Sequence, residues 1–174
     1  MKPFRRQRDG LLHAVFSREE ADVVAALALE SATIAQTAGA ETADPSHRFD
    51  PAFRRLLPDA YPDDPAASAE FRRFTAGGLA ERKADNARLV VESLAGDQEG
   101  RRNGQVDVSL DEAGASAWLR AITDVRLVLA ARLGIVQDGD EGVVDDDDEA
   151  AFRRAVYDWL AYVQETLVMA LSRR

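Results

Sequence analysis

Residues 110–135, LDEAGASAWLRAITDVRLVLAARLGI, decide the fold of this chain. In the second half of the stretch, LVLAARL, Arg132 is the single polar residue. A helix with one apolar stripe lies on a core, whereas a helix that is apolar all round is surrounded by one. Asp111 is a suitable N-cap residue, and Gly134 is a suitable stop signal. We therefore predict a central helix over 111–133.

Capping patterns place further helices before and after this central one. Ser17, followed three residues later by Glu20, matches a capping box and predicts a helix over 18–37. Apolar residues at helical spacing, including Phe152, predict a last helix over 150–171, which should pack along the central helix. The fold class is therefore mainly α (α+β), with four to five helices and a minor sheet.

Two Asp-Pro pairs, at Asp50 and Asp64, mark the starts of helices in the middle of the chain. Asp is a good cap, and Pro is well suited to the first helical position. The first of these helices is short, because Pro58 stops it. The second is expected to weaken or bend at Gly77-Gly78 and to resume over 79–94.

Three extended segments predict the minor sheet. Residues 4–8 and 11–16 flank Asp9-Gly10, a signal for a two-residue hairpin turn. Residues 105–110 alternate between apolar and polar side chains, which is typical of a half-buried strand. We expect the N-terminal hairpin and this third strand to share one small sheet that packs on the helices.

The composition fits a single helix-rich domain over residues 1–174, long enough to bury a core. The sequence has no cysteine, which excludes disulfides and thiolate metal sites and fits a reducing cytoplasm. No run of apolar residues is long enough to span a membrane. We therefore expect a cytoplasmic protein without a membrane partner.

The charge of the chain is concentrated in one stretch. The formal net charge is −9, and residues 138–149, DGDEGVVDDDDE, contain eight of the acidic residues and no basic one. The rest of the chain is almost neutral, so the net charge does not exclude a basic surface elsewhere. We expect a mobile acidic loop over 137–149, because its spacing does not match a calcium-binding loop.

Four charged residues on the apolar central helix are the first candidates for a functional or structural role: Arg120, Asp124, Arg126 and Arg132. Polar groups on such a helix must be paired, directed to solvent or used in function. Arg120 and Asp124 are four residues apart, so the two side chains share a helix face and can pair. We favour pairing or solvation over a functional use for these four side chains.

The N-terminal hairpin carries a candidate basic patch of Arg5, Arg6 and Arg8. The tripeptide Phe-Arg-Arg also occurs four times, beginning at Phe4, Phe53, Phe71 and Phe152. We interpret the repeats as structural, with the ring facing the core and the arginines facing out. The alternative is a surface that binds phosphate or a partner, since arginines interleaved with aromatic residues are typical of nucleic-acid sites.

No recognisable catalytic motif is present. The sequence lacks G-x-S-x-G, a P-loop and G-x-G-x-x-G, and neither His13 nor His47 has a partner at metal-ligand spacing. We therefore predict no catalytic residue, no metal and no cofactor. An unrecognised hydrolase or small-ligand binder stays open as an alternative, because acid and base partners can be distant in the sequence.

The order of four segments resembles an actinobacterial family known as domain of unknown function number two thousand and seventeen. These segments are FRRLLPDAYPDDPAASAEFRRFT (53–75), KADNA (83–87), AWLRAITDVRLVLAARLGI (117–135) and YDWLAYVQETLVMAL (157–171). The resemblance covers most of the chain, and its most specific parts are 56–65 and 118–135. It supplies no catalytic residues.

The family resemblance implies a regulatory role. Its members are often encoded beside the adaptor of the Clp protease, and some are linked to transcriptional responses to oxidative stress through a thiol pair. This chain departs from that pattern, because it has no cysteine and therefore no disulfide-based sensor.

We accordingly expect a non-enzymatic regulatory or interaction protein that binds a protein partner, a homodimer being one form of this. The alternative is a DNA-associated transcriptional regulator that uses the basic patch and the Arg-Arg pairs.

Overall fold

The computed structural model describes residues 1–40, 50–95, 104–137, 139–142 and 148–172. Within these ranges the chain forms five helices and a three-stranded sheet, so the prediction of a mainly α fold with a minor sheet is confirmed. In chain order the elements are β1 Lys2–Arg6, β2 Leu12–Ser17, α1 Arg18–Gly39, α2 Pro51–Leu56, α3 Pro65–Ala95, β3 Gln105–Leu110, α4 Glu112–Arg132 and α5 Asp148–Ser172.

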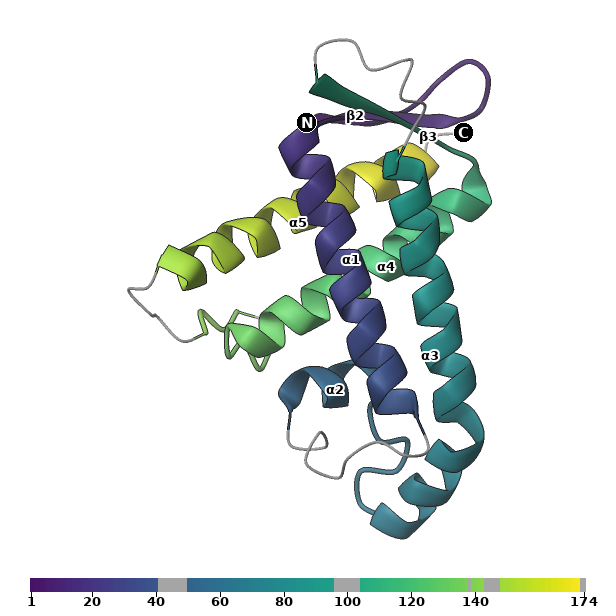
Figure 1. The fold of residues 1–174 in the computed structure, drawn as a ribbon, viewed down its shortest axis with the longest axis vertical. Coiled ribbons are helices and arrows are strands. Elements are labelled where there is room, and N and C mark those ends of the chain that lie inside the picture. The colour runs from purple at the N-terminus through teal and green to yellow at the C-terminus, as the bar shows by residue number, and fades with distance from the viewer. Residues whose placement is uncertain (41–49, 96–103, 138, 143–147, 173–174) are drawn as a thin grey trace.

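The central element is α4, as the sequence predicts. It contacts all four other helices and also β3. Figure 1 shows α4 crossing behind α1, with α5 above it and α2 below it. Trp118 lies at the centre of the core and is fully buried. Its indole packs against the rings of Phe4 and Phe16, with centroids 5.5 and 5.7 Å away, and its Nε1 donates to Ser93 Oγ at 2.9 Å.

The sheet has the order β1-β2-β3, and both strand pairs are antiparallel. One face is apolar and lies on the helices; its buried side chains are Phe4, Leu12, Ala14, Phe16, Val106, Val108 and Leu110. The predicted alternation over 105–110 is therefore confirmed. The predicted capping box also forms, because Ser17 Oγ accepts from the amide of Glu20, and the Glu20 carboxylate accepts from the amide of Ser17.

The hairpin turn differs from the predicted two-residue turn. The amide of Gln7 donates to the carbonyl of Leu11 at 2.9 Å, and the amide of Gly10 donates to the carbonyl of Gln7 at 3.1 Å. The loop therefore has three residues, Arg8 to Gly10, with Gly10 at a φ of 85°. A type I turn followed by a left-handed glycine is the usual form of such a loop.

Helix α3 continues through Gly77-Gly78, where the sequence predicts a weak or bent point. Its buried residues are mostly alanines, which pack against the alanine-rich face of α1. The two helices approach so closely at Gly39 that a Cβ added there would lie only 2.6 Å from the Cβ of Ala80. Close packing of small residues holds α3 together across the glycines, and it gives no strong periodic signal in the sequence.

The Phe-Arg-Arg repeats do not all follow the predicted orientation. Phe4 is buried, and Phe53 is partly buried, but Phe71 and Phe152 are 44% and 57% exposed. Both exposed rings lie near the first turns of long helices, beyond the main core. The ring of Phe71 packs edge-on against Tyr61 at 6.1 Å. The inward orientation is therefore wrong for these two repeats.

Residues 138 and 143–147 of the predicted acidic loop lie outside the described residues. The described part shows that α5 begins at Asp148, two residues before the predicted start. Asp148 and Glu149 occupy its first turn, where negative charge is favourable beside the helix dipole. In the described part of the chain, no helix combines the length and hydropathy that crossing a membrane requires.

Candidate functional site

The four candidate charges of the central helix do not form one site. Arg132 pairs with both carboxylate oxygens of Asp50, at 2.9 and 3.0 Å, and so fixes the start of α2. Arg126 points toward α5, where its Nη1 donates to Gln164 Oε1 at 2.8 Å and its guanidinium lies over the Tyr157 ring at 4.8 Å. Both arginines therefore connect α4 to neighbouring elements.

Asp124 is buried and pairs across helices. Its Oδ1 lies 2.5 Å from Lys83 Nζ on α3. The spacing in the sequence suggested Arg120 as the partner of Asp124, but the structure pairs Asp124 with Lys83. Arg120 is exposed and makes no ion pair with any described residue. Burial raises the pKa of the Asp124 carboxyl above its ordinary value, although Lys83 acts in the opposite direction.

A hollow of about 840 Å³ between α3 and α4 surrounds this ion pair. Its lining includes three cationic and two anionic side chains: Arg82, Lys83, Arg120, Asp85 and Asp124. The two anions already have partners, since Lys83 holds Asp124 and Arg88 holds Asp85. The hollow has mixed charge, and its buried ion pair serves the packing of α3 on α4.

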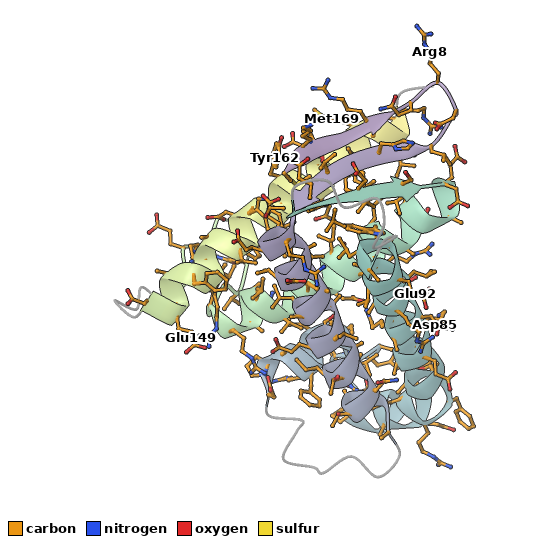
Figure 2. The ribbon with its side chains drawn as sticks, turned by 45° about the horizontal axis from the view of Figure 1, so that its top comes forward. Arg8, Asp85, Glu92, Glu149, Tyr162 and Met169 are labelled. Carbon is orange, nitrogen blue, oxygen red and sulfur yellow. The ribbon has the colours of Figure 1, made fainter. Side chains whose placement is uncertain are left out.

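A second hollow of about 790 Å³ lies between the N-terminal hairpin and α5. We call it the hairpin groove. It is lined by Pro3, Phe4, Arg5, Arg6, Gln7, Arg8, Tyr162, Thr166, Met169 and Ala170. On α5, the spacing of Tyr162, Thr166 and Met169 places the three side chains on one helix face. Figure 2 shows Tyr162 and Met169 on the edge of the molecule where the hairpin lies, with Arg8 at the tip of the hairpin.

Hydrogen bonds attach the hairpin to α5 and so define the floor of the groove. The amide of Phe4 donates to Thr166 Oγ1 at 3.4 Å, and Arg6 Nε donates to the carbonyl of Ala170 at 3.4 Å. Arg6 also donates to the carbonyl of Gly10 at 3.0 Å and pairs with Glu112 at 3.4 Å. Of the predicted basic patch, Arg6 therefore has a structural role.

Arg5 and Arg8 are the two arginines of the patch that stay available to a ligand. Both are exposed, and neither is in an ion pair with a described residue. None of the lining residues is acidic. The nearby Asp9 is occupied, because its carboxylate accepts from the amide of Leu11 at 2.9 Å, which lowers its pKa, and lies 3.3 Å from His13 Nε2.

The groove combines these cations with exposed apolar surface. Tyr162 is 45% exposed and Met169 is 53% exposed. The sequence predicts the basic patch, but it does not single out Tyr162 or Met169 as part of a site. Helical spacing could have identified these two residues as exposed. Both fall outside the inward face of α5, which Val163, Leu167 and Ala170 form.

Within the described residues, no three histidine, aspartate or glutamate side chains gather into a group that could hold a metal ion. The described lining of the hairpin groove does offer groups that suit binding. Two guanidinium groups can donate to carboxylates in paired geometry, and the phenol and thioether offer adaptable apolar contacts.

Comparison with known proteins identifies relatives. The model of the family described as "Domain of unknown function (DUF2017)" matches residues 1–171. The chain is 34% identical over 141 residues to the "Oxidative stress regulator AosR" of Mycobacterium tuberculosis strain H37Rv. This alignment covers 76% of this chain and 63% of the relative. It is 35% identical over 135 residues to the "Putative oxidative stress regulator AosR" of Mycobacterium leprae, covering 70% of this chain and 58% of the relative.

The matched region thus spans less than two thirds of the length of these curated relatives. No solved structure matches the chain.

Proposed function

Because the chain belongs to the DUF2017 family, whose curated relatives are named oxidative stress regulators, we propose that it is a non-enzymatic regulator of the oxidative stress response. It acts by binding an acidic segment of a partner protein in the hairpin groove. The observation that supports this most strongly is that Arg5 and Arg8 line the same hollow as the exposed Tyr162 and Met169.

The charge of the hairpin groove specifies the chemistry of the partner. Two guanidinium groups that pair with no described residue stand at a site whose described lining is not acidic, so a segment rich in Asp or Glu is electrostatically complementary to it. Arginine and tyrosine are enriched among the residues that carry binding energy at protein interfaces. An apolar side chain of the segment would cover Tyr162 and Met169, while its carboxylates meet the arginines.

The same charges argue against DNA as the ligand. Arg6 is held by Glu112, so among the arginines that line the groove, Arg5 and Arg8 are the two without an ion pair to a described residue. DNA binding gains affinity from each phosphate that a lysine or arginine neutralises, and two arginines supply few such contacts. Figure 2 also shows acidic Asp85 and Glu92 on α3, away from the hairpin.

We expect reversal of the two free charges to weaken binding of an acidic segment. The probe is a short synthetic peptide of glutamates around one phenylalanine, titrated into the full chain and followed by NMR. Shifts should be confined to β1 and the second half of α5 and should shrink as salt is added. In the double variant Arg5→Glu/Arg8→Glu, affinity should fall roughly tenfold, because reversing two exposed charges costs about 1–2 kcal/mol.

The matched control is Arg82→Glu/Arg120→Glu, which makes the same charge change in the hollow between α3 and α4. It should leave the affinity for the peptide unchanged. A loss of binding in this control but not in the hairpin variant would move the site to the other hollow. Binding of a DNA duplex in place of the peptide, abolished by Arg5→Glu/Arg8→Glu, would favour the nucleic-acid alternative.

A further inference from the structure

The sulfur atoms of the chain are very unequal in exposure. The sequence has no cysteine and two methionines, Met1 and Met169. The Met1 side chain is 2% exposed, and its amino group pairs with Glu20 at 2.5 Å. Met169 is 53% exposed and lines the hairpin groove between α5 and the hairpin. One accessible thioether therefore lies within the apolar part of the proposed binding surface.

We propose that Met169 is an oxidant-responsive modification site that controls occupancy of the hairpin groove. The oxidant is a peroxide, hydrogen peroxide being the simplest. A lone pair of the thioether sulfur attacks one peroxide oxygen, and the O–O bond breaks. With hydrogen peroxide, the departing hydroxide takes the proton from the oxygen now bound to sulfur and leaves as water. Met169 is thereby oxidised by two electrons to the sulfoxide, and the peroxide is reduced.

Oxidation changes the surface that a partner meets. A sulfoxide is polar and accepts hydrogen bonds, whereas the thioether is apolar and polarisable. An apolar side chain of the bound segment would then lie against a polar group and lose its favourable contact. The partner is released, and reduction of the sulfoxide by a methionine sulfoxide reductase restores the site. This inference rests on the proposed function, since the groove must first bind an acidic segment.

The experiment treats the full chain with increasing hydrogen peroxide and locates the added oxygen by peptide mass spectrometry. Affinity for the glutamate–phenylalanine peptide is then measured before oxidation, after oxidation and after reductase treatment. We expect Met169 to be oxidised well before Met1, and binding to weaken up to about tenfold and then recover. The variant Met169→Leu has no thioether in the groove, so its own affinity for the peptide, whatever its starting value, should be the same before and after peroxide treatment.

The outcomes separate the two proposals. If the untreated chain does not bind the peptide, the proposed function fails, and control of the groove by Met169 fails with it. If the untreated chain binds and the chain oxidised at Met169 binds equally well, only the present inference is overturned. Equal rates of oxidation at Met1 and Met169 would also overturn it, as would an unchanged response to peroxide in Met169→Leu.

Discussion

Replacing Trp118 by alanine should reduce the free energy of unfolding by about 3–5 kcal/mol, as is usual when a buried tryptophan is deleted. Trp118 is fully buried on α4 and contacts the rings of Phe4 and Phe16, so the cavity would open where helix and sheet meet. Domains of this kind have a total stability of about 5–15 kcal/mol. The variant should therefore unfold at a much lower denaturant concentration than the wild type.

Equilibrium unfolding in urea, followed by circular dichroism, measures this loss. The stability of Trp118→Phe should lie between those of the wild type and Trp118→Ala, because phenylalanine keeps an aromatic ring but loses the hydrogen bond to Ser93. The matched control is Tyr162→Ala on the groove surface, which should change stability by less than about 0.5 kcal/mol. A midpoint for Trp118→Ala within error of the wild type would show that α4 is not the centre of the core.

The second large effect is expected from the ion pair between α3 and α4. Lys83→Met removes the cation 2.5 Å from Asp124 and leaves a buried carboxylate without a partner. Breaking a buried pair in this way typically costs about 3–5 kcal/mol. The double variant Lys83→Met/Asp124→Leu should recover most of the loss, because two apolar side chains can replace the pair. Thermal and urea unfolding of the single and double variants gives the comparison.

The loss in Lys83→Met should depend on pH in a defined direction. Burial raises the folded-state pKa of Asp124 above its ordinary value of 3.8. Below that value the carboxyl is protonated in both states, so it adds no penalty. As pH rises through the interval between 3.8 and the folded-state pKa, the unfolded chain releases its proton first, and stability is lost. Removing Lys83 widens this interval, so the deficit of the variant should be larger at neutral pH than at about pH 4.

An exposed ion pair on the same helix supplies the control. Arg88 pairs with Asp85 at 2.6 Å, and both side chains are largely exposed. Arg88→Met should cost no more than about 1 kcal/mol at any pH, because water screens such pairs. A pH-independent deficit in Lys83→Met, equal to that of Arg88→Met, would contradict a buried role for Asp124.

Local signals in the sequence predict much of the fold. The apolar run before Gly134, the capping box at Ser17 and Glu20, and the alternation over 105–110 each specify an element through neighbouring residues. The continuity of α3 is missed because it depends on packing of Ala80 against Gly39 of α1, which no local pattern reports.

The site is less predictable for the same reason. The choice of Lys83 over Arg120 as the partner of Asp124 is made by the packing of two helices that are distant in the sequence. The basic patch is visible in the sequence, but its apolar complement on α5 becomes evident only when Tyr162 and Met169 are placed beside the hairpin. A groove between distant segments is a property of the tertiary fold.

The central claim, that the hairpin groove binds an acidic protein segment, is tested most directly by photo-crosslinking in cells. Benzoylphenylalanine is placed at Tyr162 or, as a control, at Phe152, an exposed aromatic near the other end of α5. The account predicts crosslinks from position 162 to an Asp- or Glu-rich peptide of another protein. These crosslinks should be lost in Arg5→Glu/Arg8→Glu and be absent from position 152. Equal crosslinking from both positions, or crosslinks only to a second copy of the chain or to nucleic acid, would contradict it.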